Sequence, residues 1–115
     1  MSRIERVAEL IKKEVSSILR EKVSDPRIGF VSLTDVEILP DLKIAKIFFS
    51  VLGDEKAKKD SLAGLKSATS YIRCELGHVL KLKFVPEILF VYDKSLERGS
   101  RVLSLMNKVK DQKEL

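Results

Sequence analysis

Residues 30–52 read FVSLTDVEILPDLKIAKIFFSVL and carry the clearest structural signal in the chain. Two runs in which apolar and polar residues alternate, 30–39 and 42–52, are separated by Pro40 and Asp41, a pair that favours a turn. Extended runs joined by so short a link form a β-hairpin. The alternation in the first run changes phase near Asp35. In the second run one face holds Ala45, Ile47, Phe49 and Val51, and the other holds Lys46, Phe48 and Ser50.

The segment before the hairpin is predicted to form a helix over residues 3–23. Its apolar residues recur at steps of three and four: Ile4, Val7, Ala8, Ile11, Val15, Ile18 and Leu19. Ser2 has the side chain of an N-cap, and Glu5 completes a capping box. Asp25 ends the helical segment because the residue before a proline avoids helical geometry.

A second helix is predicted after the hairpin. Gly53 breaks the strand, and Asp54 is placed to cap the helix. The apolar stripe consists of Leu62, Leu65, Ala68 or Thr69, Ile72 and Leu76. Residues 67–70 are small, and their hydroxyl groups can bond back to helix carbonyls, so we expect a kink at Ala68, Thr69 and Ser70. Gly77 is the expected C-terminus of this helix.

The C-terminal part adds a third strand over 86–92, PEILFVY, and a last helix over 96–110 that Asp93 or Ser95 would cap. A strand that follows a long helical crossover can pair in parallel with the hairpin. The sequence therefore predicts an α+β fold of two layers, with a three-stranded mixed sheet and helices on one face. The single domain would span residues 1–110, and residues 111–115 would fray. The order α-β-β-α(kink)α-β is that of the type II KH domain, an RNA-binding fold, and the C-terminal helix is an addition to it.

Composition narrows the class of protein. The chain has 115 residues, 44% of them hydrophobic and 34% charged, which suits one folded domain. No apolar run approaches the roughly 18 residues of a membrane span, and the first ten residues, MSRIERVAEL, lack a signal-peptide pattern. We therefore expect a cytoplasmic protein with no membrane partner.

The sequence gives little support to catalysis. One cysteine, Cys74, and one histidine, His78, can form neither an internal disulfide nor a structural zinc site. We interpret their spacing as coincidence, and no glycine-rich phosphate loop is present. Asp35 and Glu37 share a strand face without a nucleophile nearby in the sequence, so we interpret them as solvated. We expect no metal, no cofactor and no enzymatic activity.

The charge balance indicates a different partner. Lysine and arginine number 22 and aspartate and glutamate 17, a formal net charge of +5. An excess of this size on a small domain is typical of nucleic-acid binding, although a basic soluble protein without such a partner remains the alternative.

Four segments resemble the ribosome-binding factor A family of bacterial small-subunit maturation factors. They are IERVAELIKKEVSSIL (4–19), SDPRIGFVSLTDVEILPDLKIAKIFFSVLG (24–53), SYIRCELG (70–77) and PEILFVYDKSLERG (86–99). The resemblance covers residues 3–103, and its most specific parts are DPRIGF (25–30) and FVYDKSLERG (90–99).

This resemblance implies a type II KH-like fold in which an Ala-x-Gly helix-kink-helix replaces the usual G-x-x-G loop. The matching positions here are Ala68, Thr69 and Ser70, so serine stands in place of the glycine. The resemblance also implies binding to the immature 30S ribosomal subunit and to 16S rRNA, including its 5′ terminal helix region. It implies a role in late maturation and 5′-end processing that matters most in the cold, without catalysis. Nothing in the sequence demands more than a monomer.

Such a partner would be held by cations on one surface, because each neutralised phosphate releases counterions. The candidate RNA-binding residues are Lys43, Lys46, Lys66, Arg73, His78, Lys81, Lys83, Arg98 and Arg101. Arg73 lies in the matched SYIRCELG segment, and His78 stands where the family often has a basic residue. His78 would be mostly uncharged at neutral pH, because the reference pKa of histidine is about 6.5.

Structural roles compete with RNA contact at several positions. Lys46 lies beside Phe48 on the strand face opposite the apolar set, which is also what a solvated face would show. His78 can simply be a surface residue at a helix end, and Cys74 is expected to be buried or half-buried.

Other arginines have acidic partners within reach in the sequence. Arg27 can pin its loop through Asp25, and Arg98 and Arg101 can pair with Glu97 or another acid in place of a phosphate. For the whole protein, the alternatives to an assembly factor are a general single-stranded RNA-binding KH module and an adaptor that binds proteins through its sheet. The first would need the glycine-rich loop, and the second would bind almost independently of salt.

Overall fold

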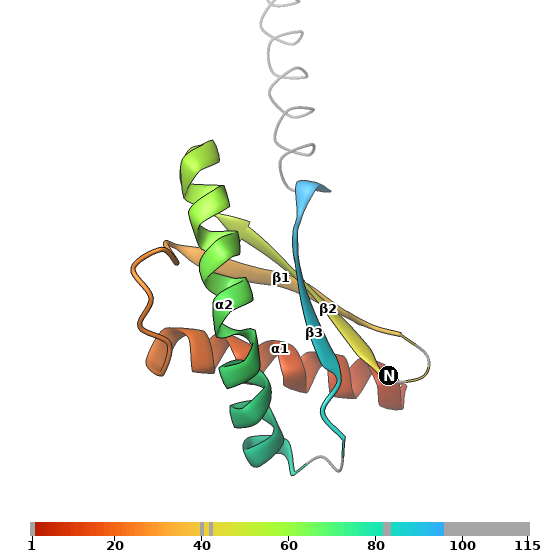
Figure 1. The fold of residues 1–115 in the computed structure, drawn as a ribbon. Helices are drawn as coiled ribbons and strands as arrows, with labels where there is room; N and C mark the ends of the chain where they lie inside the picture. The colour runs from red at the N-terminus through yellow and green to blue at the C-terminus, as the bar shows by residue number, and fades with distance from the viewer. Residues whose placement is uncertain (1, 40, 42, 82–83, 96–115) are drawn as a thin grey trace, which may run out of the picture.

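The structure, a computed structural model, describes residues 2–39, 41, 43–81 and 84–95. Its elements are α1 (Arg3–Glu21), β1 (Val31–Ile38), β2 (Ile44–Val51), α2 (Glu55–Leu80) and β3 (Glu87–Tyr92) (Figure 1). The segment predicted to form the last helix, residues 96–110, lies outside the described residues, and so does the tail over 111–115.

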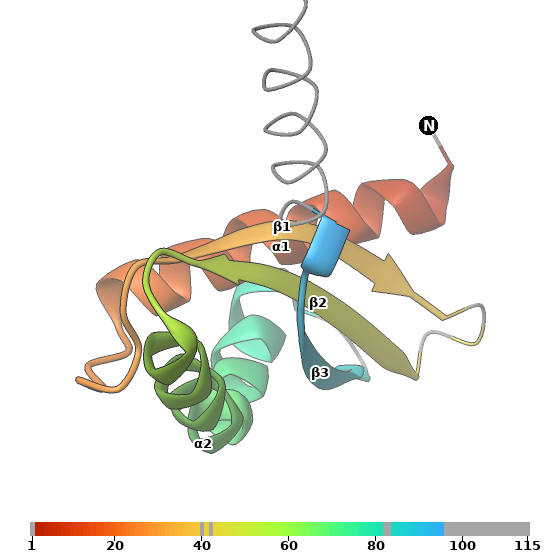
Figure 2. The same ribbon diagram turned by 90° about the horizontal axis from the view of Figure 1, so that it is seen from above.

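The three strands form one mixed sheet in the order β1-β2-β3, with β2 in the centre (Figure 2). β1 and β2 are antiparallel, and β2 and β3 are parallel, as predicted for a hairpin followed by a helical crossover. The pairing of β1 with β2 shifts register between Leu33 and Asp35, so Thr34 is the extra residue of a β-bulge. The change of phase near Asp35 in the sequence is therefore a bulge in the structure.

The core lies on one face of the sheet. The alternation of β2 places Ala45, Ile47, Phe49 and Val51 on the buried side, and both helices contribute to the same apolar cluster. The helix residues fully buried in it are Ile11, Val15, Leu65, Ile72 and Leu76. Phe49 lies at its centre, with Phe90 and Tyr92 edge-on to its ring at centroid distances of 6.4 and 5.8 Å. The result is the predicted two-layer α+β fold with helices on one face.

Both predicted helix starts are capped as expected. The Ser2 hydroxyl accepts a hydrogen bond from the Glu5 N–H at 3.1 Å, and the Asp54 carboxylate accepts one from the Ala57 N–H at 2.9 Å. These bonds satisfy N–H groups that have no partner within the helix.

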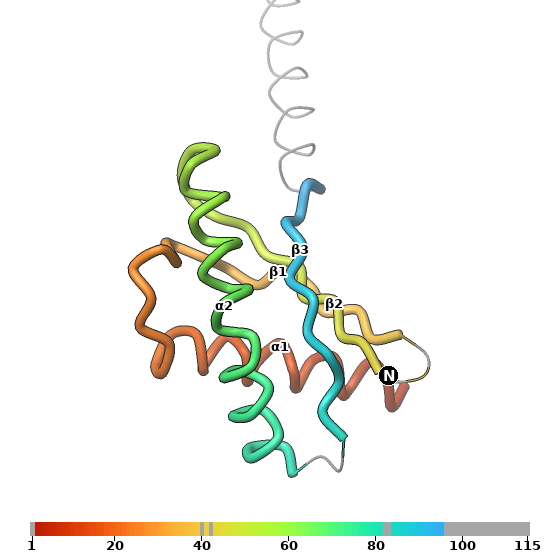
Figure 3. Tube along the Cα trace, viewed as in Figure 1, coloured from red at the N-terminus to blue at the C-terminus, as the bar shows by residue number. Residues whose placement is uncertain are grey.

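The helix α2 runs for 26 residues without a break (Figure 3). The Thr69 hydroxyl donates to the Leu65 carbonyl at 2.9 Å, which is the expected back-bond, but the helix continues through Ala68 and Ser70 rather than dividing in two. The prediction that α2 ends at Gly77 is wrong, because the helix extends to Leu80.

The glycine at position 77 has a packing role instead. A Cβ atom built there would lie 2.8 Å from Cγ2 of Val85, so the absence of a side chain lets the segment before β3 approach the helix. Lys81, the C-cap after the last helical residue Leu80, has a left-handed backbone with φ of 52°.

Candidate nucleic-acid interface

The outward face of α2 presents a line of exposed residues at steps of three and four. We call it the α2 outer stripe; its members are Lys56, Lys59, Ala63, Lys66, Ser70, Cys74, His78 and Lys81. Asp54 fixes where the helix begins, and the burial of Leu65, Ile72 and Leu76 fixes which side turns outward. At a rise of about 1.5 Å per residue the stripe is roughly 37 Å long.

The α2 outer stripe carries cations near both ends and small uncharged side chains between Lys66 and His78. The acidic residue between Lys66 and His78 is Glu75, which forms a salt bridge with Lys22: Nζ of Lys22 lies 2.7 Å from Oε2 of Glu75. This contact raises the pKa of Lys22, first through the hydrogen bond and then through the opposite charge. A nucleic-acid backbone can therefore approach the centre of the helix while lysines at either end contact phosphates.

The structure brings three of the predicted contacts together on this stripe: Lys66, His78 and Lys81. It places two others elsewhere, because Lys43 precedes β2 and Lys46 lies half-buried on the uncovered face of the sheet, opposite Glu37 of β1. Lys83, Arg98 and Arg101 lie outside the described residues.

Arg73 is used by the fold. Its guanidinium donates from Nε to the Pro86 carbonyl at 3.1 Å and from Nη2 to the Val85 carbonyl at 3.0 Å. The side chain is half-buried and holds the segment before β3 against α2. Two N–H groups of the guanidinium therefore bond within the protein, so the structure gives Arg73 a structural role.

Two lysines of the stripe, Lys56 and Lys59, are not among the cations that the sequence predicts to contact RNA. A signal was present, since both lie at helical spacing from Lys66 once Asp54 is taken as the cap. Cys74 was expected to be buried or half-buried, and this is wrong: it is exposed at the centre of the stripe.

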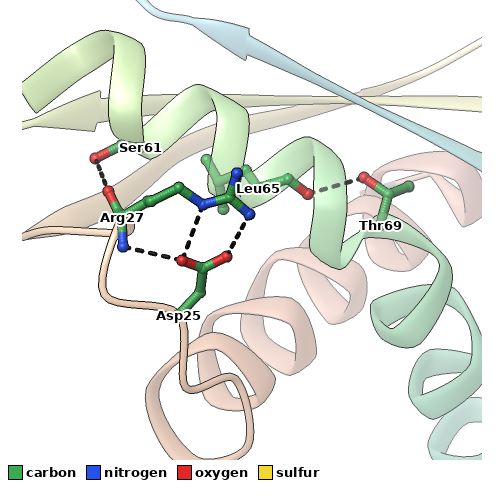
Figure 4. Close-up of polar contacts among 5 residues, drawn as sticks. All are labelled: Asp25, Arg27, Ser61, Leu65 and Thr69. Atoms are coloured by element: carbon green, nitrogen blue, oxygen red, sulfur yellow. Dashed lines mark hydrogen bonds and ion pairs between the residues drawn. The ribbon is translucent and has the colours of Figure 1, made fainter. Parts of the chain in front are cut away.

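The loop between α1 and β1 is fastened to itself and to α2 (Figure 4). Asp25 accepts hydrogen bonds from the backbone N–H of Arg27 at 2.9 Å and from its guanidinium at 3.1 and 2.8 Å. The hydroxyl of Ser61, fully buried in α2, accepts from the Gly29 N–H at 3.2 Å and donates to the Arg27 carbonyl at 3.5 Å. The structural role considered for Arg27 is thereby confirmed.

A shallow cleft of about 260 Å³ lies between the end of α1 and the middle of α2. Its walls are Lys22, Val23, Ser24, Asp25, Ser67, Ala68 and Tyr71. It borders the uncharged centre of the α2 outer stripe, and Ala68, the first of the three expected kink residues, forms part of its wall. Ala68 also packs against the core, whereas Ser70 is exposed.

Among the residues that the structure describes, no group of three His, Cys, Asp or Glu side chains is placed to hold a metal ion. Within the same residues, neither helix combines the length and the apolar character that crossing a membrane requires.

Comparison with known proteins gives the family. The sequence model of the family described as ribosome-binding factor A matches residues 3–106. The ribosome-binding factor A of Halothermothrix orenii is 53% identical over 112 residues, which cover 97% of this chain and 92% of that protein. The chain therefore belongs to the ribosome-binding factor A family.

Solved structures agree on the fold. The solution structure of the Thermotoga maritima protein TM0855 is 29% identical, with a TM-score of 0.71 over 83% of this chain and 93% of that one. A homology model of the Thermus thermophilus ribosome binding factor A, fitted into a cryo-electron microscopy map of a 30S complex of that protein, is 14% identical, with a TM-score of 0.60 over 83% of this chain and 97% of that one.

Proposed function

We propose that this protein is a non-enzymatic assembly factor that binds the immature 30S ribosomal subunit through 16S rRNA. The proposal is supported by the family, whose name is that of a ribosome-binding factor, and by the Thermus thermophilus relative that has been placed in a complex with the 30S subunit. The single observation that carries it is the α2 outer stripe, in which cations flank a small-residue centre and no member is acidic.

The site acts by charge and shape. Lysines of the stripe neutralise phosphates, and the release of counterions supplies the affinity. Structured RNA is recognised largely through its backbone and shape, so a helix face with short central side chains suits close approach without reading bases. No step of this action needs a cofactor.

The finer role follows from the family resemblance. The protein would contact the region of the 5′ terminal helix of 16S rRNA, support late maturation and 5′-end processing, and matter most in the cold. It would act as a monomer in the cytoplasm and leave before translation begins. Lys43, Lys46, Lys83, Arg98 and Arg101, none of which belongs to the α2 outer stripe, stay predicted RNA contacts.

The test is co-sedimentation with immature small subunits, mature 30S subunits and an unrelated structured RNA across a salt series. The parent chain is compared with a triple variant, Lys56→Gln, Lys59→Gln and Lys66→Gln. We expect the slope of log affinity against log salt to fall by roughly 0.7–0.9 for each phosphate contact removed.

A matched control removes the same charge from α1, at the exposed residues Arg6, Lys13 and Arg20, each changed to Gln. This control is expected to bind the small subunit like the parent chain. Equal loss in both variants would show that net charge matters and the stripe does not. Equal binding of the parent to every RNA would contradict the assembly-factor role and favour a general RNA-binding module.

A further inference from the structure

The open end of the hairpin carries two large apolar side chains that the core does not cover. Phe30 and Leu52 lie next to the terminal pair of the β1–β2 ladder, Val31 with Val51. The Leu52 N–H donates a hydrogen bond to the Phe30 carbonyl at 3.1 Å, so the two residues are neighbours. Phe30 keeps 81% of its surface exposed and Leu52 keeps 78%. We call this pair the apolar corner.

The backbone of the apolar corner is held on both sides. Before Phe30, the Gly29 N–H donates to the hydroxyl of the buried Ser61 in α2 at 3.2 Å. After Leu52, Gly53 turns the chain toward α2 with a φ of 142°, a conformation that favours glycine. The exposure of the two side chains therefore belongs to a fixed part of the fold, and adjacent apolar side chains exposed in this way indicate a binding site.

The apolar corner adjoins the beginning of α2, where the α2 outer stripe starts. Lys56 lies in the first turn of the helix, and Lys59 lies about one turn further. Within the part of the chain that the structure describes, neither lysine forms a salt bridge. The two acids that begin this segment have partners, because Asp54 caps the helix and Glu55 pairs with Lys58 at 3.0 Å. An RNA strand whose phosphates contact these two free stripe lysines has its next nucleotides beside the apolar corner.

An aromatic ring beside lysines is the combination that binds single-stranded nucleic acid, because the ring stacks a base while the cations hold the backbone. Stacking tolerates any base, which suits an interface that recognises RNA by charge and shape. We propose that the apolar corner stacks one unpaired base of the RNA bound by the α2 outer stripe, with the ring of Phe30 on the base and Leu52 beside it. The inference rests on the proposed function, since both use the same RNA.

The first test is fluorescence. The chain contains no tryptophan, so Phe30→Trp creates a single reporter. The probe is protein-free 16S rRNA, titrated at constant salt, and we expect the fluorescence of this variant to fall because a stacked base quenches the indole. The matched control is Leu10→Trp on α1, a position that is 48% exposed, and its fluorescence is expected to stay constant. Equal quenching at both positions, or no quenching of Phe30→Trp while the RNA binds, overturns the proposal.

Affinity for the same RNA gives a second readout. We expect Phe30→Ala to weaken binding by roughly 5- to 150-fold, the usual effect of removing one stacked ring, and Phe30→Tyr to bind like the parent chain. The slope of log affinity against log salt is expected to stay that of the parent, because stacking releases no counterions. In the variant that lacks Lys56, Lys59 and Lys66 the slope falls instead. Thermal unfolding of each variant checks that the fold is kept.

Two further results overturn the proposal. Parent-like affinity of Phe30→Ala for protein-free 16S rRNA would show that no base is stacked on the ring. Weaker binding of Phe30→Ala to immature small subunits, without weaker binding to the protein-free RNA, would assign the apolar corner to a protein of the subunit. Failure of the proposed function is distinguishable from both, because the parent chain itself would then not bind the small subunit, and this inference would fail with it.

Discussion

Arg73 was predicted to contact RNA, but in the structure its guanidinium donates hydrogen bonds to two backbone carbonyls of the same chain. Both carbonyls that it contacts, those of Val85 and Pro86, precede β3 and lie outside its pairing with β2. Removing the guanidinium leaves these carbonyls without that donor, and a lost partner at a half-buried polar group is costly.

We expect Arg73→Met to lower the free energy of unfolding by about 1–3 kcal/mol, the cost of losing hydrogen bonds to a charged donor. Lys66→Met on the exposed stripe is the control and should change it by no more than about 0.5 kcal/mol. Urea denaturation of both variants measures the difference. An Arg73 variant as stable as the control would show that the two carbonyl contacts contribute nothing.

Asp25 makes part of the stability dependent on pH. Hydrogen bonds from the Arg27 side chain, and then from its backbone, lower the pKa of Asp25 below its usual value. A carboxylate with a lowered folded-state pKa stabilises the fold above its unfolded-state pKa, and this contribution is lost as pH falls through the folded-state value.

We therefore expect Asp25→Asn to be less stable than the parent at pH 7 and the gap to close as the pH is lowered from about 4 toward 2. Asp93 titrates in both chains, so its effect cancels in the comparison. Denaturation midpoints at a series of pH values give the gap directly. A gap that stays constant down to pH 2 would rule out the charged pair as its cause.

At the level of elements, the loop before β1 packs closely against the first half of α2 because a glycine of α2 has no side chain at the point of contact. Gly64 is buried in α2, and a Cβ atom there would lie 2.6 Å from Cγ1 of Ile28. The buried Ser61, one turn earlier, holds the same loop by hydrogen bonds. The DPRIGF motif is thus a docking segment for α2.

We expect Gly64→Ala to destabilise the protein by about 1–2 kcal/mol, because overpacking against Ile28 outweighs the gain in helix propensity. Gly29→Ala is the matched control, since its Cβ would meet only the Ser61 hydroxyl, at 3.8 Å. Thermal unfolding of the two variants checks the contrast. Similar midpoints for both would mean that the loop moves aside without cost.

For the whole molecule, local sequence signals predicted the elements well and their mutual contacts poorly. The hairpin, the change of phase near Asp35 and the caps at Ser2 and Asp54 can be read from short stretches of sequence. The partners of Arg73 and the packing of Gly77 on Val85 join α2 to the segment before β3, and no local pattern reports such contacts.

For the candidate interface too, one part could be predicted from local sequence and another part depends on tertiary contacts. Helical spacing from the Asp54 cap suffices to place Lys56, Lys59 and Lys66 on one face, and it also orients His78. Whether a cation on that helix remains available depends on what packs beside it, as Arg73 shows. Helical spacing predicts which side chains point outward from α2, whereas tertiary contacts determine which of those cations remain available to bind RNA.

The parallel pairing of β3 with β2 has a consequence for the order of folding. The hairpin closes through a short turn. Ile44 and Glu87 also pair, but the whole of α2 separates them in the sequence. Closing the longer loop costs more chain entropy. We expect the hairpin to form early and β3 to be the last strand added. During synthesis, the edge of β2 that pairs with β3 therefore stays unpaired until β3 has been made.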